Sequence, residues 1–478
     1  MPSRFLSVQA PILVGVVCAV GISLTIALSG IPMLVVADAA LILVIVLSTS
    51  LIALPYGRAH LFSPPTLVLP YLVLSLGIRG FTTISSSQSE LSSAVDMTSF
   101  ATAGTVTYAL TLGTIATLAY LTAFYVSTGD PLRKLPLAPS GLNLRPRGVM
   151  LLLAVTVCIS APAYLVLMAR LGMDAILRPG AVAVQSTKGL FWAFPLLWAP
   201  ILGALLAAGD RWAAGRPAGL LPVFTFLVSI LAAFFLTSSK AFLFGGALIW
   251  LIMRHHMYRR TSLLIVLMVP VLGTFALPLL YAYRAFGMLG ISMFARNANL
   301  LGNGFELLLG RSYSADAFIA TILYSPTPFP YELGRPWLEI FYFWIPRVFW
   351  PTKPLSQSLE FGQTFLSSSA QAGQSYFSVS LLGDGYLNLG ALGSILVFLI
   401  LGVLSGVLYD RCVLRKSSAG TVLLFCSCAY PLAVSTEQSL SVFLTLFLPQ
   451  LFIGSCVYLC YRWISRFEVL TSLERRGK

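Results

Sequence analysis

The chain is dominated by apolar runs long enough to cross a lipid bilayer, and this feature restricts its fold more than any other. A transmembrane helix needs about 20 apolar residues. Twelve runs meet or approach that length: 11–29, 31–54, 61–79, 101–126, 149–168, 191–209, 218–236, 240–253, 261–283, 386–408, 420–436 and 440–461. Only 10% of the 478 residues are charged, against about 25% in a soluble protein. We therefore expect an all-α polytopic membrane protein with about 12 transmembrane helices.

The distribution of Lys and Arg favours one orientation of these helices. With both termini in the cytoplasm, more than half of the 30 basic residues fall in cytoplasmic loops or the C-terminal tail, including the clusters at 254–260 and 411–416. The positive-inside rule predicts this asymmetry. Three segments follow: helices 1–9 over residues 1–283, a large extracytoplasmic loop with short helices over 284–385, and helices 10–12 with a cytoplasmic tail over 386–478. Because no cleavage site with a polar start follows the first run, we expect it to be an uncleaved helix.

Two features of the composition exclude other classes of protein. The formal net charge is +14, but cytoplasmic loops account for most of it, and basic patches with stacking platforms are absent outside the apolar runs. Nucleic-acid binding is therefore not expected. The seven cysteines lie in or beside apolar runs, which fits packing inside the membrane better than a disulfide framework or a metal site.

One segment differs from the apolar remainder of the chain. Residues 337–393 concentrate aromatic residues, prolines, charges and turn formers, in the order WLEIFYFWIPRVFWPTKP, a Ser/Gln-rich passage and GDGYLNLGALG. Since the expected topology exposes most of this segment outside the membrane, we interpret it as the working face of a membrane enzyme.

A group of cations is predicted near the outer membrane boundary. Its members are Lys240, Arg284, Arg311, Arg347 and Lys353. Cations at a membrane–water boundary suit a lipid-linked phosphate or pyrophosphate, because Arg binds it in a bidentate manner and Lys supplies a compact charge. The alternative is that each side chain only snorkels to the interface.

The acidic residues supply candidate bases. The three histidines are expected on the cytoplasmic side, so an extracytoplasmic base would have to be a carboxylate. Asp384 is the first candidate, because glycines on both sides predict a tight turn just before a helix; an Asp there could instead be a helix cap. Asp316 and Glu437 are the reserve candidates.

Aromatic and polar residues near these groups are candidates for the substrate lining. Trp344 and Trp350 belong to the aromatic group that begins at Trp337, which could stack on sugar rings or form an ordinary interfacial belt. Tyr386 and Asn388 follow Asp384 in the same GDGYLN motif, and we add them, together with Asp316 and Glu437, to the predicted lining.

The chain resembles the Wzy-type polymerases of bacterial O-antigen, capsule and exopolysaccharide repeat units. The motifs that carry the resemblance are IPRVFWPTKP (345–354) and GDGYLNLGALG (383–393), supported by SSKAFLFG (238–245) and GRSYSADAF (310–318). The resemblance covers roughly residues 225–410. Two residues depart from the family pattern: Lys240 stands where relatives often carry Arg, and Asp384 stands where the turn often carries Glu.

The resemblance implies a GT-C-like, all-helical glycosyltransferase of the bacterial inner membrane that needs no metal or other cofactor. Such an enzyme polymerises undecaprenyl-pyrophosphate-linked oligosaccharides at the outer face of that membrane, and a chain-length regulator and a flippase are left open as further partners. The family's pyrophosphate-binding arginines correspond to Arg284, Arg311 and Arg347. We accordingly predict Asp384, Arg311 and Arg347 as catalytic residues, with Lys240, Arg284 and Lys353 on the pyrophosphate.

Other functions remain open at this stage. An O-antigen ligase would be expected to carry a His in the external loop, and this loop has none. A transporter or flippase of lipid-linked sugars would favour charged residues deep in several spans and two pseudo-symmetric halves, whereas the charges here gather at one boundary apart from Asp38. A scaffold for other assembly enzymes would not need the cation group.

Overall fold

The computed structural model describes residues 61–72, 103–128, 141–171, 193–237, 239–262, 314–342, 349–354, 379–415 and 418–476, together with residues 265, 279–280, 283, 345, 360–361 and 364. Every regular element in these ranges is helical, so the all-α prediction is confirmed. Seven of these helices are long and apolar enough to cross a membrane. The expected spans 11–29 and 31–54 lie outside the described residues, as does nearly all of 261–283.

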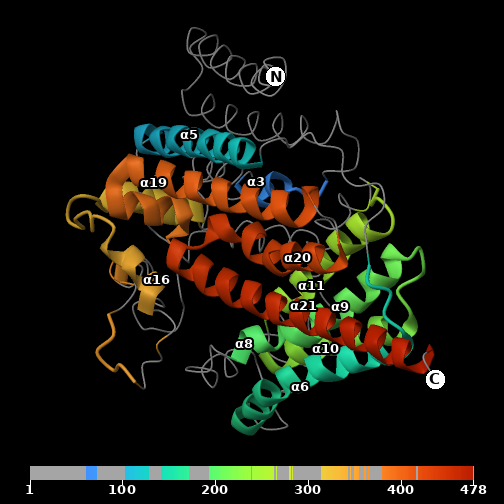
Figure 1. Ribbon diagram of the computed structural model, residues 1–478. Helices are drawn as coiled ribbons and strands as arrows, with labels where there is room; N and C mark the ends of the chain where they lie inside the picture. Colours follow the sequence, from blue (N-terminus) through green and yellow to red (C-terminus); the bar gives the residue numbers. More distant parts are fainter. Residues whose placement is uncertain are drawn as a thin grey trace, which may run out of the picture. The chain divides into compact units, whose positions relative to one another are not determined.

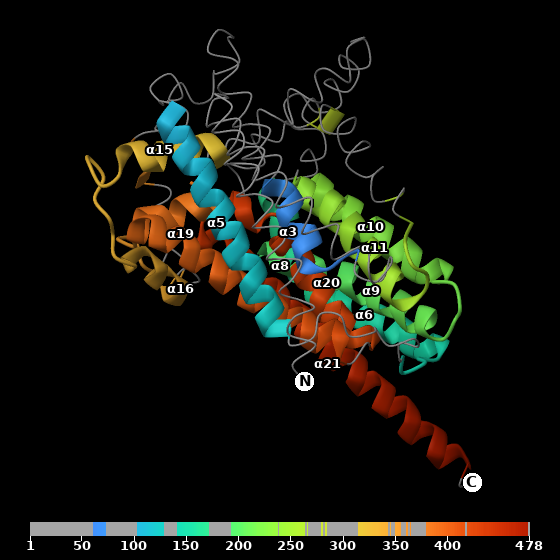
Figure 2. The same ribbon diagram turned by 90° about the horizontal axis from the view of Figure 1, so that it is seen from above.

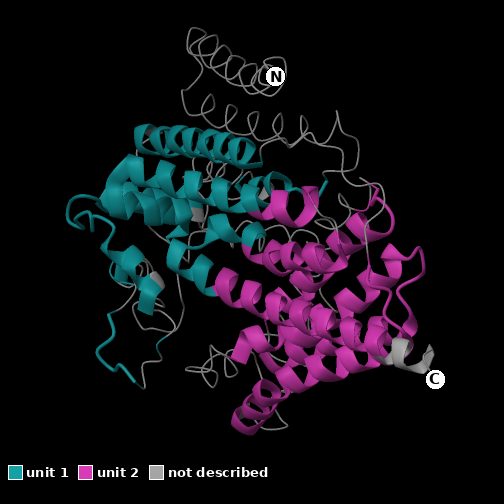
Figure 3. Ribbon diagram, viewed as in Figure 1, with its two compact units in different colours: residues 1–131, 306–407, 432–445 teal, residues 132–305, 408–431, 446–478 magenta. Residues whose placement is uncertain are grey.

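The chain divides into two compact units (Figure 3). Unit 1 comprises residues 1–131, 306–407 and 432–445, and unit 2 comprises residues 132–305, 408–431 and 446–478. The two longest C-terminal helices, α19 (Ser380–Tyr409) and α21 (Leu440–Arg476), each contribute residues to both units. The units are described one at a time.

Unit 1 is built around α19. Its other elements are α3 (Pro64–Leu72), α5 (Ala103–Thr128), α15 (Ser314–Tyr324), η5 (Arg335–Leu338), α16 (Glu339–Tyr342), η7 (Ser435–Glu437) and the start of α21. Helix α5 runs along α19 (Figures 1 and 2), and glycines allow the close approach: a Cβ at Gly402 would lie 2.8 Å from the Ala123 Cβ. Close packing at small residues stabilises helix pairs in lipid, where the hydrophobic effect does not drive helices together.

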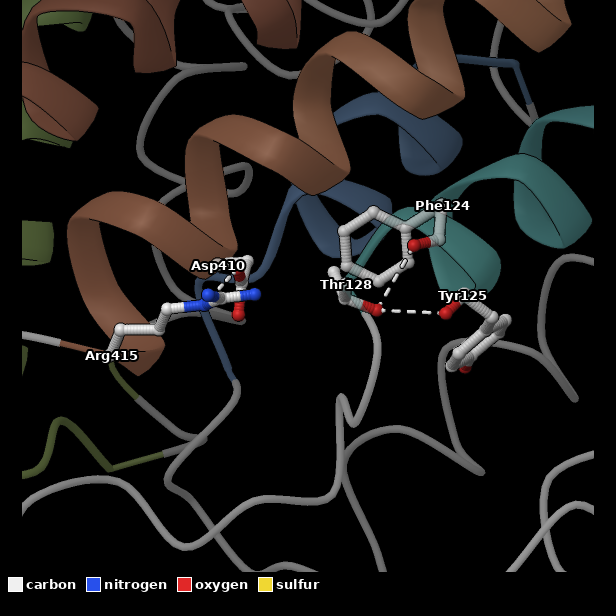
Figure 4. A network of polar contacts seen from close by, with 5 residues as sticks. All are labelled: Phe124, Tyr125, Thr128, Asp410 and Arg415. Atoms are coloured by element: carbon white, nitrogen blue, oxygen red, sulfur yellow. Dashed lines mark hydrogen bonds and ion pairs between the residues drawn. The ribbon is translucent and has the colours of Figure 1, made fainter.

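The ends of α5 and α15 are also fixed within unit 1. The hydroxyl of Thr128 donates to the carbonyls of Phe124 and Tyr125 at the C-terminal end of α5 (Figure 4). Such bonds satisfy carbonyls that the helix end leaves without an intrahelical partner. Helix α15 packs against α5, so this short helix of the expected external loop contacts a helix that is long and apolar enough to cross a membrane.

Unit 2 is a helical bundle around α9 (Trp198–Ala213), which is preceded by the single turn α8 (Ala193–Leu196). Helices α6 (Pro146–Leu171), α10 (Leu220–Thr237) and α11 (Lys240–Met257) pack on α9. The α9 sequence is rich in Ala and Gly, and the side chain of Met253 on α11 packs directly against Gly209. Three helices pack on α9, and it is buried over almost its whole length.

The C-terminal elements complete unit 2. They are η6 (Asp410–Leu414), most of α20 (Ala419–Ala433) and the later part of α21. Arg415 forms an ion pair with Asp410 where η6 ends (Figure 4). Two of the expected spans, 240–253 and 440–461, differ from the observed helices. Helix α11 is not among the seven long apolar helices, and α21 continues to Arg476, well beyond residue 461 where its apolar run ends.

Candidate active site

The candidate site in unit 1 lies at a break in α19. Leu389 (φ −140°, ψ 25°) and Gly390 (φ 61°, ψ −148°) have non-helical backbone angles, and helix precedes and follows them. The glycines on both sides of Asp384 predict a tight turn at residues 383–385 and a helix after it. That prediction is wrong, because the helix begins at Ser380 and the chain turns at Gly390, where a positive φ favours glycine.

The glycines of GDGYLNLGALG allow the two parts of α19 to touch. A Cβ at Gly385 would lie 2.6 Å from the Gly393 carbonyl oxygen and 2.7 Å from the Ser394 Cα, which is closer than any side chain allows. The hydroxyl of Ser394 donates to the carbonyl of Leu382 at 2.8 Å, across the break. The short first part, residues 380–388, therefore lies against the start of the long second part.

The loop before η5 binds to this break. The break frees two carbonyls from intrahelical bonding: Leu387 accepts from the Glu332 amide at 3.1 Å, and Asn388 accepts from the Leu333 amide at 3.0 Å. Tyr331 covers Gly390, since a Cβ on that glycine would lie 3.3 Å from the Tyr331 hydroxyl. Buried backbone groups must find partners, so the break determines where this loop docks.

Docking of the loop brings Trp337 to Asp384. The indole Nε1 of Trp337 donates to Asp384 Oδ2 at 3.1 Å, and the amide of Leu440, the first residue of α21, donates to the same oxygen at 3.4 Å. Both bonds end on Oδ2, so Oδ1 accepts none from donors in the described part of the chain. Asp384 is 3% exposed, and it caps the N-terminus of α21, where the helix dipole favours a negative charge.

Asn388 and Glu339 lie beside this carboxylate. The amide nitrogen of Asn388 donates to the backbone carbonyl of Asp384 at 2.8 Å, one helical turn away. Glu339, the first residue of α16, is buried and is close enough to Asp384 for their charges to interact. Two acidic side chains in one buried region are typical of sites that hold or transfer a proton.

Hydroxyl-bearing residues surround the start of α21. Ser435, Thr436, Ser439 and Ser441 are all buried. The Thr436 hydroxyl has no hydrogen-bond partner among the described residues, although the side chain is 2% exposed. Glu437 lies in η7, directly before this helix start, and is half-buried. The start of α21 is therefore unusually polar for a buried helix end.

Tyr386 and Asp316 join the site from two helices. Tyr386 follows Asp384 on α19, and its ring lies edge-on to Tyr331 at 6.0 Å and to Phe318 at 6.3 Å between centroids. Asp316 lies in the first turn of α15 and is buried. Helix α15 therefore contacts the first part of α19, which brings Asp316 and Tyr386 into the same packed region.

A smaller cluster lies after α16. The Lys353 ammonium donates to the Ile345 carbonyl at 3.2 Å and lies 5.8 Å from the centroid of the Tyr342 ring. Trp350 meets the same ring edge-on at 5.5 Å. Burial and the nearby charge of Glu339 raise the pKa of Tyr342, whereas Arg335 acts in the opposite direction. Glu339 thus interacts electrostatically both with this cluster and with Asp384.

The predicted cation group is only partly described. Arg284, Arg311, Arg347 and Trp344 lie outside the described residues. Lys240 is the first residue of α11 in unit 2, and Lys353 belongs to unit 1. Their assembly around a pyrophosphate therefore stays a prediction.

Two residues of the site, Trp337 and Glu339, are not among the predicted site residues. Trp337 is expected there only as part of an aromatic group, and Glu339 is not singled out, although Trp337 donates to Asp384 and the charge of Glu339 acts on it. Their order, an indole donor two residues before an acid, was the one local signal. This short pattern is not specific by itself, because the residue it acts on, Asp384, follows 47 residues after Trp337.

A buried carboxylate in unit 2 has a different character. Asp210 accepts from the amides of Asn143 at 3.0 Å and Leu144 at 2.8 Å, and from the Tyr461 hydroxyl. These bonds use both of its oxygens and join α9, the start of α6 and α21. A carboxylate bonded on both oxygens is suited to holding structure, which leaves Asp384 as the better candidate for chemistry.

No protein family, curated protein or solved structure matches this chain. Among the described residues, no group of three or more His, Cys, Asp or Glu side chains could hold a metal ion.

Proposed function

We propose that this protein is a membrane glycosyltransferase that polymerises undecaprenyl-pyrophosphate-linked oligosaccharide repeat units, with Asp384 as its general base. The observation that carries the proposal is the arrangement of Asp384: a buried carboxylate whose Oδ2 is bound by Trp337 and Leu440, while Oδ1 accepts no bond from the described donors. A base held through one oxygen can present the other to a substrate hydroxyl in a fixed direction.

The depth of the site supports a lipid-linked substrate. Residues 391–409, between the break and Asp410, carry no charged side chain. As a helix, this run is about 28 Å long, close to the ~30 Å of a hydrocarbon core. The break would then lie at one boundary of the core, with Asp384 at the level of the lipid headgroups, where a pyrophosphate attached to a polyprenyl chain would lie.

The reaction follows from this position. Asp384 Oδ1 takes the proton of an acceptor sugar hydroxyl. At the same time the hydroxyl oxygen of the acceptor bonds to the anomeric carbon of the donor glycan. The bond from this carbon to the undecaprenyl pyrophosphate breaks, and the pyrophosphate leaves with the electron pair. Arg284, Arg311 and Arg347, with Lys240 and Lys353, would neutralise the charge that develops on it.

The aromatic cluster supports a carbohydrate substrate. Tyr342 and Trp350 present rings beside the Lys353 ammonium, and Trp350 is half-buried. Rings stack on the apolar faces of sugars, and a neighbouring cation suits an attached phosphate. Trp344 would extend this surface.

The proposed topology has about 12 transmembrane helices, both termini in the cytoplasm and the loop 284–385 outside, in a bacterial inner membrane. The Asp410–Arg415 ion pair and Arg411 would then face the cytoplasm, as the positive-inside rule requires. Asp384, at the other end of the same helix, would lie on the outer side.

Reconstitution tests the proposal directly. Purified protein in liposomes receives a lipid-linked repeat unit without nucleotide sugar or added metal, and the products are separated on a gel. We expect a ladder spaced by one repeat. Asp384→Asn, which keeps an acceptor oxygen for Trp337, should abolish the ladder. Arg311→Ala and Arg347→Ala should remove long products without loss of expression.

Glu360→Gln is the matched control, because Glu360 is an exposed acid of the same unit. It should leave the ladder unchanged. A normal ladder from the Asp384→Asn protein would contradict the assignment of the base, and a normal chain length from both arginine variants would contradict the assignment of the pyrophosphate site.

Transport of a lipid-linked sugar is the second candidate, and the break in α19 favours it. Discontinuous helices form the substrate sites of many transporters. In the same liposomes, movement of the lipid-linked sugar from one leaflet to the other, without a ladder, would support this candidate over the polymerase.

A further inference from the structure

We propose that the interfacial segment, residues 333–342 with Phe349, lies at the membrane boundary and inserts exposed apolar side chains among the lipids of the outer boundary. The proposal concerns how a part of the expected external loop binds the bilayer surface. It does not rest on the proposed enzyme activity.

The first observation is the exposure of large apolar side chains on this segment. Leu333 is 78% exposed, Leu338 55%, Phe341 73% and Phe349 81%. Phe224, on the apolar helix α10, is 63% exposed. These side chains are thus about as exposed as Phe224 on a candidate membrane helix. Such exposure in water would promote aggregation.

The second observation fixes the depth of the segment. The amides of Glu332 and Leu333 bond to the carbonyls of Leu387 and Asn388 at the break in α19. The uncharged run after this break has the length of one hydrocarbon core. Leu333 therefore begins the segment at the edge of the core, within one hydrogen bond of a membrane helix.

The polarity of the neighbouring residues agrees with an interfacial position. Leu338 and Phe341 are three residues apart in consecutive helical turns, which puts them on one side. Arg335 is exposed, while Glu339, the acid of the same turns, is buried. Exposed apolar groups beside an exposed cation match a bilayer boundary with anionic headgroups.

These observations favour bilayer lipid over a soluble partner. A segment hydrogen-bonded to a membrane helix at the edge of its apolar run meets lipid before it can meet a protein in bulk water. The apolar side chains then pack among acyl chains. The loop that positions Trp337 is held at the surface by these lipid contacts and by its hydrogen bonds to the break in α19.

Photo-crosslinking in nanodiscs of phosphatidylcholine and phosphatidylglycerol tests the proposal. Phe341 is replaced by p-benzoylphenylalanine, a change that an exposed position tolerates, and adducts are identified by mass spectrometry after illumination. The same replacement at Phe224 is the positive control for lipid contact. The same replacement at Glu360, an exposed charged residue of unit 1, is the control for a side chain in water.

We expect phospholipid adducts at residue 341 at a yield comparable with residue 224 and about tenfold or more above residue 360, as for an interfacial side chain. A yield at residue 341 equal to that at residue 360 would overturn the proposal. So would an adduct to a second copy of the chain, because the exposed side chains would then cover a protein interface.

Discussion

Replacing Gly393 by Ala should separate the two parts of α19. A Cβ on Gly393 would overlap the carbonyl of Gly385, and a Cβ on Gly385 would lie 2.6 Å from the carbonyl oxygen of Gly393. The opposing atoms are backbone in both directions, so no flexible side chain can move aside. The first part of α19, which carries Asp384, would have to shift.

The magnitude follows from two opposing contributions. Overpacking costs about 1–3 kcal/mol, and a clash between backbones belongs at the upper end of that range. Ala in place of Gly inside a helix recovers about 0.5–1 kcal/mol. The net loss is about 2 kcal/mol, which corresponds to a fall in Tm of roughly 4–8 °C for a domain of about 200 residues.

Gly383→Ala is the matched control for this prediction. It lies in the same short segment, but its nearest neighbours are side-chain atoms of Thr321, the closest at 3.2 Å, so Tm should change by no more than a degree or two. Thermal unfolding in detergent measures all variants. The variant Gly385→Ala/Gly393→Ala should lose less than the sum of the single losses, because both residues share one contact.

The reasoning would be refuted if Gly393→Ala proved as stable as Gly383→Ala. The two parts of α19 would then not touch at these glycines, and the position of Asp384 would need another explanation.

Three further substitutions test other contacts. Trp337→Phe keeps an aromatic ring but removes the donor to Asp384. A hydrogen bond to a charged group is worth about 1.5–3 kcal/mol, so its loss should lower kcat/KM for polymerisation by roughly 10- to 100-fold. An unchanged rate would exclude a positioning role for Trp337. Tyr461→Phe removes one of three donors to Asp210 and should destabilise unit 2 by about 1–3 kcal/mol, measured as Tm, with no direct effect on the chemistry. Gly402→Leu should force α5 away from α19 and cost about 1–3 kcal/mol, seen as faster proteolysis of unit 1.

The apolar runs predicted several helices to within a few residues. The helices α5, α6, α10 and α20 agree with the runs because hydropathy over a whole turn decides where a helix can cross lipid. Hydropathy alone places the end of a helix too early where the last turns are amphipathic. Helix α21 continues through the tail to Arg476 (Figure 2), where polar and apolar residues alternate at helical spacing and hydropathy falls.

The GDGYLNLGALG motif was located correctly and interpreted wrongly. Paired glycines around an Asp favour a turn in a soluble protein, which is why the turn was expected at residues 383–385. In a membrane helix, glycine also allows backbone to approach backbone. Gly385 and Gly393 serve that purpose, and only Gly390 turns the chain.

The partners of Asp384 lie beyond the reach of local patterns. Trp337 precedes it by 47 residues and Leu440 follows it by 56, and one of the two donors is a backbone amide with no side-chain signature. Hydropathy and spacing report what one element prefers, whereas these bonds depend on which elements meet.

The position of a carboxylate in the sequence therefore does not reveal its use, but its hydrogen bonds do. Asp210 and Asp384 are both buried helical carboxylates next to glycine, and burial alone does not separate them. In Asp210 the donors occupy both oxygens, so removing its charge would leave three elements without an anchor. In Asp384 both donors bind the same oxygen. Only the second arrangement leaves an oxygen that no described donor occupies, and for this reason we propose the chemistry for unit 1.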